Sequence, residues 1–255
     1  MDFKVFGLSD KGRIRDSNQD SFLINESEKL FLVADGLGGR ASGDIASRLA
    51  IENFETFILK SHEENTKWPV KRKSSFSAEE NRLFAAAVVS NHKIKSKGRK
   101  DPSMKGMGAA LLGVKIDTNH LAVINIGDCR LYRIRDNKIT QLTKDQTLVS
   151  EEERKGHITR EEAEYHPKRH ILTSALGHLG NNSKMGLFRT DFQEKDLFLL
   201  CTDGLYRMLD DNDILNIINN NREKSLYKMG ITMILKANLA GGTDNITVVL
   251  LSFDQ

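Results

Sequence analysis

The chain has 255 residues, of which 39% are hydrophobic and 29% are charged, and its formal net charge is +3. This composition is typical of a folded protein with a sizeable core and excludes an intrinsically disordered chain. So small a charge does not require nucleic acid as a partner. We see no signal peptide, and no run reaches the ~20 apolar residues of a membrane span. We therefore expect a cytoplasmic protein that binds neither nucleic acid nor membrane.

In chain order, short runs rich in Val, Ile and Leu predict strands. They cover residues 3–9, 20–26, 29–35, 108–116, 120–127, 130–136, 197–203 and 245–253. Turns of hairpin size separate several of these runs, as in DTN (117–119) and RDNK (135–138). Consecutive strands joined by tight turns indicate antiparallel sheets.

Apolar residues at helical spacing predict helices between these runs. The longer ones cover residues 42–60, 77 to about 96, 211–219 and 225–239. Capping boxes open the helix at Ser77 (with Glu80) and predict two short helices in a charged insert, at Ser150 (with Glu153) and Thr159 (with Glu162). Gly241 closes the last helix. With 3 prolines and no Pro/Ser/Gly linker, one domain spanning 1–255 is the simplest organisation.

The cysteines and the basic runs do not indicate a site. Cys129 and Cys201 lie in or beside apolar runs without the spacing of metal ligands, so we expect them to be reduced and buried. The basic stretches at 71–73 and 93–100 lack the interleaved aromatics of a nucleic-acid surface. We expect both stretches to be solvated surface.

Aspartates recur where strand-like runs begin or end beside small residues. Asp35 and Asp203 each end an apolar run and precede glycine, Asp128 follows Gly127, and Asp244 precedes the last run. Taken singly, each is typical of a turn. Four together favour a site for Mg²⁺ or Mn²⁺, which prefer oxygen ligands and offset the repulsion between carboxylates.

The stretch GLGGRA (36–41) also fits a second interpretation, a dinucleotide-binding turn between a strand and a helix. That fold needs an acidic residue after the next strand, ~20 residues on, where this chain is still helical. The charge of Asp35 would also repel a pyrophosphate. A nucleotide-binding oxidoreductase is therefore disfavoured.

Seven motifs in order carry a resemblance to a known family. RDSNQD, VADGLGGRASG, GMGAALLGV, INIGDCRLYRI, HPKRHILTSALG, CTDGLYRML and GGTDNITVVLL resemble the metal-dependent Ser/Thr protein phosphatases of the PP2C (PPM) type, above all the compact bacterial branch. The resemblance extends from about Phe3 to Phe253. It implies an α+β fold, a four-layer α-β-β-α sandwich of two antiparallel sheets flanked by helix pairs, with metals in a cleft at one end.

The resemblance also implies the metal ligands. Asp35 would bridge two Mn²⁺ or Mg²⁺ ions, and the carbonyl of Gly36 would bind one of them. Asp203 and Asp244 would hold the other ion. Asp128, with Asp203, would support a weaker third ion.

The remaining site residues follow from the same resemblance. Asp20 would orient metal-bound waters, Arg15 would hold the substrate phosphate, and Asn245 would support the geometry around Asp244. A water activated by the metals would attack phosphoserine or phosphothreonine directly, without a phosphoenzyme. The expected partners are phosphorylated proteins, including targets of a Ser/Thr kinase, and nothing demands more than a monomer.

Departures from the family pattern concern the surroundings of the metals. Alanines 109 and 110 replace threonines, Cys129 replaces a serine, and Gln19 stands where eukaryotic relatives carry glutamate. Leu37 and Arg40 occupy the stretch where relatives often place a proton-donating histidine, so a metal-bound water would donate instead.

The charged insert 145–170 resembles a mobile flap, although a plain surface excursion explains it equally well. A non-catalytic module that binds phosphoproteins is the second functional hypothesis, and the intact acidic set argues against it.

Overall fold

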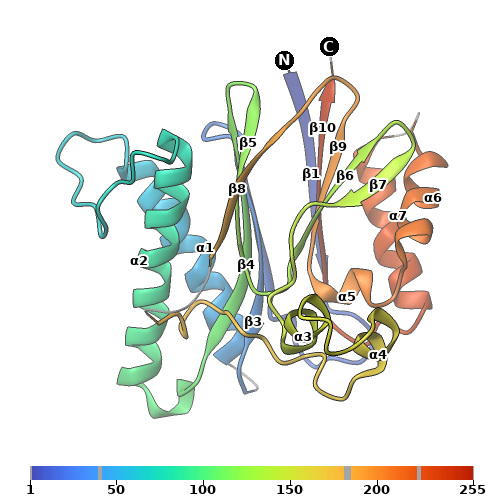
Figure 1. The fold of residues 1–255 in the computed structure, drawn as a ribbon, viewed down its shortest axis with the longest axis horizontal. Coiled ribbons are helices and arrows are strands. Elements are labelled where there is room, and N and C mark those ends of the chain that lie inside the picture. Colours follow the sequence, from blue (N-terminus) through green and yellow to red (C-terminus); the bar gives the residue numbers. More distant parts are fainter. Residues whose placement is uncertain (1, 40–41, 181–184, 223–224, 255) are drawn as a thin grey trace.

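The computed structural model describes residues 2–39, 42–180, 185–222 and 225–254. Two antiparallel five-stranded sheets lie face to face, and a pair of helices covers the outer face of each (Figure 1). This arrangement is the predicted four-layer sandwich. The first sheet has the order β2 (Asp20–Asn25), β3 (Leu30–Leu37), β4 (Gly108–Asp117), β5 (His120–Ile126), β8 (Gly186–Asp191). The second has the order β1 (Asp2–Asp10), β10 (Ile246–Asp254), β9 (Leu197–Cys201), β6 (Arg130–Arg135), β7 (Lys138–Gln141).

The helices divide into covering pairs and short elements at one end. The pair on the first sheet is α1 (Ser42–Lys60) and α2 (Ala78–Lys100), and the pair on the second is α6 (Asp211–Asn219) and α7 (Leu226–Leu239). Short helices α3 (Leu148–Arg154), α4 (Arg160–Tyr165) and α5 (Asp203–Tyr206) lie at the end of the sandwich opposite the chain termini (Figure 1). A 3₁₀ turn, η1 (Pro102–Met104), follows α2. Within the described residues, no helix combines the length and apolar character needed to cross a membrane.

Three apolar layers hold the sandwich together, and the central one joins the sheets. Side chains such as Phe31, Leu112 and Phe198 alternate inward from both sheets and are fully buried. Their neighbours along each strand point outward to the covering helices. Burial on both faces explains why these strands read as continuous apolar runs in the sequence.

The structure corrects the predicted elements at several places. Strands β7 and β8 were not predicted, because each is a short edge strand with few apolar residues. The predicted run 197–203 ends as a strand at Cys201, and Asp203 instead begins α5. The capping box at Ser150 is wrong: Thr147 caps α3, and its hydroxyl accepts from the Ser150 amide. The boxes at residues 77 and 159 are confirmed.

Antiparallel connectivity gathers the aspartates of the strand ends. Strand β2 begins at Asp20 directly opposite Asp35 near the end of β3. Strand β10 begins just after Asp244, beside the end of β9 that leads to Asp203. Asp128 lies in the turn between β5 and β6. The aspartates therefore meet at the end of the sandwich that carries α3, α4 and α5.

Candidate active site

A pair of carboxylates on neighbouring strands forms one side of the site. Asp20 and Asp35 are cross-strand partners, so their side chains lie on the same face of the sheet. The hydroxyls of Thr202 and Thr247 both donate to Oδ2 of Asp20, each at 2.7 Å. These two hydrogen bonds link the first sheet to the second and fix the direction of the Asp20 carboxylate.

The opposite side of the site is built on α5. Asp203 occupies the first turn of this helix, and Arg207 follows four residues later, with Nη2 2.9 Å from Oδ2 of Asp203. The same nitrogen lies 3.6 Å from Oδ2 of Asp128. The hydroxyl of Tyr206 lies 3.3 Å from that Asp128 oxygen, and the guanidinium of Arg130 stacks on the Tyr206 ring at 3.6 Å.

Arg15 and Asp244 form the third side. Nη2 of Arg15 donates to Oδ2 of Asp244 at 2.6 Å, although about half of the arginine side chain is exposed. Asn245 holds the adjoining backbone, because its Nδ2 donates to the carbonyls of Lys11 and Ser17 while its Oδ1 accepts from the Gln19 amide. The loop that carries Arg15 is thus tied to the residue after Asp244.

The electrostatics show that these carboxylates lie close together. The pKa of Asp20 is raised to about 7: burial is the largest cause, the charges of Asp203 and Asp244 add to the rise, and the two threonine hydrogen bonds oppose it. Burial also raises the pKa of Asp35, with further contributions from Asp20, Asp203, Asp128 and Asp244. The four aspartates that surround Asp35 come from segments far apart in sequence. Without cations, the folded state therefore resists ionisation of Asp20 and Asp35.

The pKa values of Asp128 and Asp203 are raised as well, and here the charge of Arg207 opposes the rise. Burial raises the pKa of Asp128 to about 7, Asp203 adds to the rise, and Arg207 opposes it. Burial raises the pKa of Asp203 as well, and there Arg207 is the largest opposing charge. Two guanidinium groups, Arg15 and Arg207, thus face five aspartates.

Glycines permit the close approaches that build the site. A Cβ on Gly36 would lie 2.0 Å from the Gly43 carbonyl oxygen, and a Cβ on Gly204 would lie 2.0 Å from that of Asn245. The glycine after Asp35 and the glycine after Asp203 are therefore required by packing. This packing requirement explains why an apolar run followed by Asp-Gly occurs twice in the sequence, at residues 29–36 and 197–204.

The donor set fits divalent ions, although the carboxylates do not form a closed cage. Across the described ranges, no three acidic, cysteine or histidine side chains surround one point closely enough to hold an ion as they stand. Arg15 and Arg207 are paired with three of the aspartates, which neutralises charge that ions would otherwise neutralise. The remaining pair, Asp20 and Asp35, offers oxygen ligands beside the backbone of Gly36, and hard cations prefer such ligands.

Sequence reasoning missed several residues of this site. Arg207 and Tyr206 follow the DG motif, where the resemblance supplied no role. His170 lies at the end of the insert, and its Nδ1 contacts Nη1 of Arg207. Burial and the charge of Arg207 lower the pKa of His170, and its electrostatic neighbours include Arg15 and Asp244. The only available signal was the presence of charged or aromatic side chains directly beside recognised motifs.

The structure also tests the predictions for the cysteines and for the dinucleotide-binding alternative. Both cysteines are buried and unpaired, as predicted. The dinucleotide-binding alternative is wrong, because every strand pairing described in these sheets is antiparallel. Ala110 is a close neighbour of Gly127, where an added Cβ would lie 2.5 Å from the alanine Cβ, so a larger side chain at 110 would need more room. Leu37 ends β3, and Arg40 lies outside the described residues.

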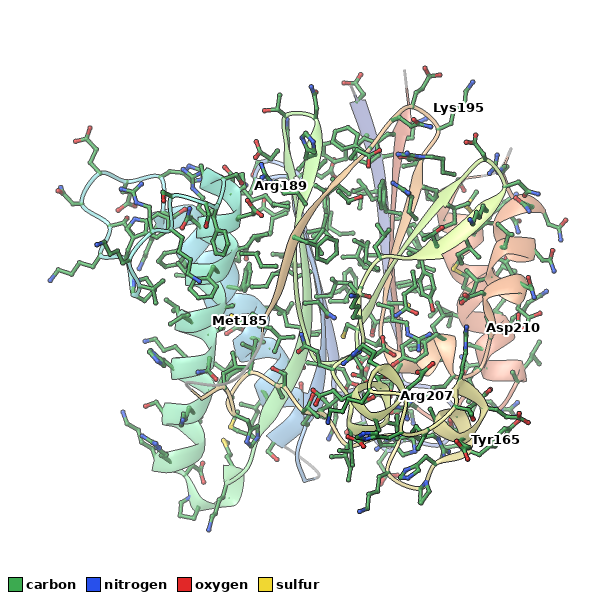
Figure 2. All side chains as sticks on the ribbon, viewed as in Figure 1. Tyr165, Met185, Arg189, Lys195, Arg207 and Asp210 are labelled. Atoms are coloured by element: carbon green, nitrogen blue, oxygen red, sulfur yellow. The ribbon has the colours of Figure 1, made fainter. Side chains whose placement is uncertain are left out.

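The insert 145–170 folds over this end of the molecule and carries α3 and α4 (Figure 1). Its base is anchored by backbone hydrogen bonds, from Leu148 to the Ile171 carbonyl and from Thr173 to the Gln146 carbonyl, both 2.8 Å. Figure 2 places Tyr165 of α4 and Arg207 at the same end of the sandwich, opposite Lys195. Tyr165 is 76% exposed, so the outer surface of the insert faces solvent.

The sequence and fold of this chain are similar to those of known phosphatases. The family profile described as Protein phosphatase 2C matches residues 13–238. The serine/threonine phosphatase stp of Listeria welshimeri is 34% identical over 250 residues, which are 95% of this chain and 92% of that protein. The solved serine/threonine phosphatase of S. agalactiae has a TM-score of 0.86 at 30% identity, covering 99% of this chain and 100% of that one.

A further solved structure resembles the chain over the same length. The catalytic domain of the phosphatase PstP, in complex with 2 manganese ions, has a TM-score of 0.82 at 30% identity and covers 99% of both chains. The family profile spans most of the chain, and the resemblance carried by the seven motifs is thereby confirmed. The chain belongs to the protein phosphatase 2C family, and it is a protein phosphatase of that type.

Proposed function

We propose that this phosphatase hydrolyses phosphoserine and phosphothreonine in proteins with the help of two Mn²⁺ or Mg²⁺ ions. One observation carries the proposal: five aspartates meet at one end of the sandwich and only two guanidinium groups face them. An end with this excess of buried negative charge is stabilised by divalent cations. The relatives named serine/threonine phosphatases, and the PstP domain with its manganese ions, support the same function.

The proposed ligands are those that the family resemblance implies. Asp35, central in the set, is proposed to bridge the two ions, with the carbonyl of Gly36 as a further ligand of one. Asp203 and Asp244, which lie on the second sheet's side, are proposed to hold the other ion. Asp128 is not needed for a site of two ions.

Bound ions would lower the pKa of a coordinated water and neutralise charge on the phosphate. The chain's own residues would do the rest. Asp20, with Oδ2 held by Thr202 and Thr247, keeps a fixed orientation and can accept a proton from the attacking water through Oδ1.

Arg15 is proposed to bind the substrate phosphate. Its side chain is half exposed and already lies beside the acidic set, where it contacts Asp244. A guanidinium presents a planar fork of donors that matches two phosphate oxygens. Asn245 fixes the loop that carries Arg15, and so it positions the arginine relative to the carboxylates.

The wider setting is proposed as follows. One phosphatase domain spans residues 1–255, and the segment 145–170 acts as a flap that controls access to the site. The substrates include targets of a Ser/Thr kinase, and the protein works as a monomer in the cytoplasm, without nucleic acid or membrane. Light scattering on the purified protein would test the monomer, and proteolysis with and without Mn²⁺ would test the flap.

The deciding experiment measures hydrolysis of phosphoserine and phosphothreonine peptides with Mn²⁺, Mg²⁺ or EDTA. We expect turnover that requires the metal, and no covalent phosphoenzyme in rapid-quench samples. A folded protein without metal-dependent turnover would contradict the proposal. A trapped phosphoenzyme would contradict direct attack by water.

A further inference from the structure

Arg207 occupies the space between two aspartates of the site. Its Nη2 lies 2.9 Å from Oδ2 of Asp203 and 3.6 Å from Oδ2 of Asp128. The side chain is 22% exposed, while those of Asp128 and Asp203 are 6% and 9% exposed. One guanidinium is therefore shared by two nearly buried carboxylates from different elements.

The guanidinium also reaches a third segment of the chain. Its Nη1 contacts Nδ1 of His170, at the end of the insert that carries α3 and α4. Arginine has only donors, so this imidazole nitrogen is the acceptor. Arg207 thus joins α5, the turn after β5 and the end of the insert.

Asp128 is further satisfied by a neutral group. The hydroxyl of Tyr206 lies 3.1 Å from the Asp128 carbonyl and 3.3 Å from its Oδ2. The Tyr206 ring is held in place by Arg130, which is itself paired with Asp145 at 2.8 Å. The oxygen that Arg207 approaches is thus enclosed by protein groups.

A divalent ion between Asp128 and Asp203 would compete with this guanidinium for the same Oδ2 atoms. The guanidinium has an advantage, because it is attached to the chain four residues after Asp203 and needs no association from solution. An additional ion would also be repelled by the positive charge of Arg207 and by ions already bound at Asp35. The local charge balance therefore favours the arginine.

We infer that Arg207 is the fixed cation of this site: it takes the place of a third metal ion, pairs with Asp128 and Asp203, and ties both to the insert through His170. The inference rests on the proposed two-metal function. Asp128 is then a partner of Arg207 and Tyr206, and not a metal ligand in this protein. Arg207 acts as a positioning residue, because it holds Asp203 and does not itself need to contact the phosphate.

The test counts bound Mn²⁺ per chain by equilibrium dialysis, with electron paramagnetic resonance of the free ion as a second readout. We expect two ions for the wild type, three for Arg207→Met and for Arg207→Gln, and two again for Arg207→Met combined with Asp128→Asn. Arg135→Met is the matched control. Arg135 also lies between two aspartates, Asp191 and Asp196, but at the other end of the molecule, so its loss should leave the count unchanged.

The outcomes separate the two proposals. A wild type that binds three ions overturns the role of Arg207, even if neither variant folds, and leaves the two-metal function intact. Folded variants that still bind two ions overturn it as well. A wild type that binds no ion or one contradicts the proposed function itself. Thermal unfolding of each variant shows whether the protein counted is folded.

Discussion

Two arginines in this protein each lie between two aspartates, at opposite ends of the sandwich. Arg135 on β6 is paired with Asp191 at 2.9 Å and with Asp196 at 2.6 Å. Asp196 is fully buried, and it also accepts from the Gln193 amide. In each of these described contacts a donor meets an acceptor, so the group needs no ligand.

The end around Arg207 differs because its carboxylates outnumber its cations. Two guanidinium groups there face five aspartates, and the pKa values of Asp20, Asp35, Asp128 and Asp203 are all raised. A cluster in which each carboxylate is paired with a cation needs no further ligand, whereas an excess of buried carboxylates favours the binding of cations. Charge balance, more than the presence of aspartates, therefore distinguishes the functional end from the structural end.

Removal of one carboxylate at each end should have the largest and most different effects. Asp203→Asn should reduce kcat for a phosphopeptide by on the order of 10³-fold or more, because it removes a proposed metal ligand and its electrostatic effect. Asp196→Ala should instead cost about 3 kcal/mol of unfolding free energy, since it leaves Arg135 without its buried partner. Kinetics and thermal unfolding of both variants provide the check. Equal losses of activity would remove the distinction between the two ends.

A second prediction concerns the backbone that carries Asp203. Gly204→Ala would place a Cβ 2.0 Å from the Asn245 carbonyl oxygen, so α5 must shift. We expect a loss of about 1–3 kcal/mol in stability and a larger fall in activity than that loss explains. Gly39→Ala is the control, because a Cβ there meets nothing within 4 Å. Denaturant unfolding and kcat measured together would refute the idea if both variants behaved alike.

Substitution of the arginine at each end should have an intermediate effect on catalysis. Arg15→Ala should lower kcat/KM by roughly 10²-fold, and Arg15→Lys by less, because lysine keeps the charge but loses the fork. Arg135→Ala should leave kcat/KM unchanged while it lowers the melting temperature. Steady-state kinetics with a phosphopeptide decide the matter, and identical values for Arg15→Ala and the wild type would count against phosphate binding.

The smallest expected effect is a pH dependence confined to the metal-free protein. The folded-state pKa of Asp20 is raised from 3.8 to about 7, so the folded state binds more protons than the unfolded state between these values. Stability should therefore decline as pH rises from about 4 to 7, and Mn²⁺ should reverse the decline. Thermal unfolding in EDTA across this range gives the slope, which should be shallower in Asp20→Asn. A stability that rises over the window would contradict this sign.

Much of the fold was predictable, for a physical reason. Strands such as β3 and β10 are buried on both faces, so apolar side chains run without interruption and mark them in the sequence. The edge strands β7 and β8 were missed, since few of their side chains are buried. The start of α3 was misplaced because Ser150 and Thr147 both suit a cap, and only the path of the chain selects Thr147.

From the sequence alone, the family, the described strands other than β7 and β8, and the aspartates beside the strand ends could be predicted, because these depend on local patterns and on seven motifs in a fixed order. Only the folded chain shows which distant groups the site residues contact. Arg207 contacts His170, 37 residues away in sequence, and Thr247 donates to Asp20 across 227 residues. No local pattern encodes such contacts, since they depend on how the two sheets pack and on the balance of charge at the end where they meet.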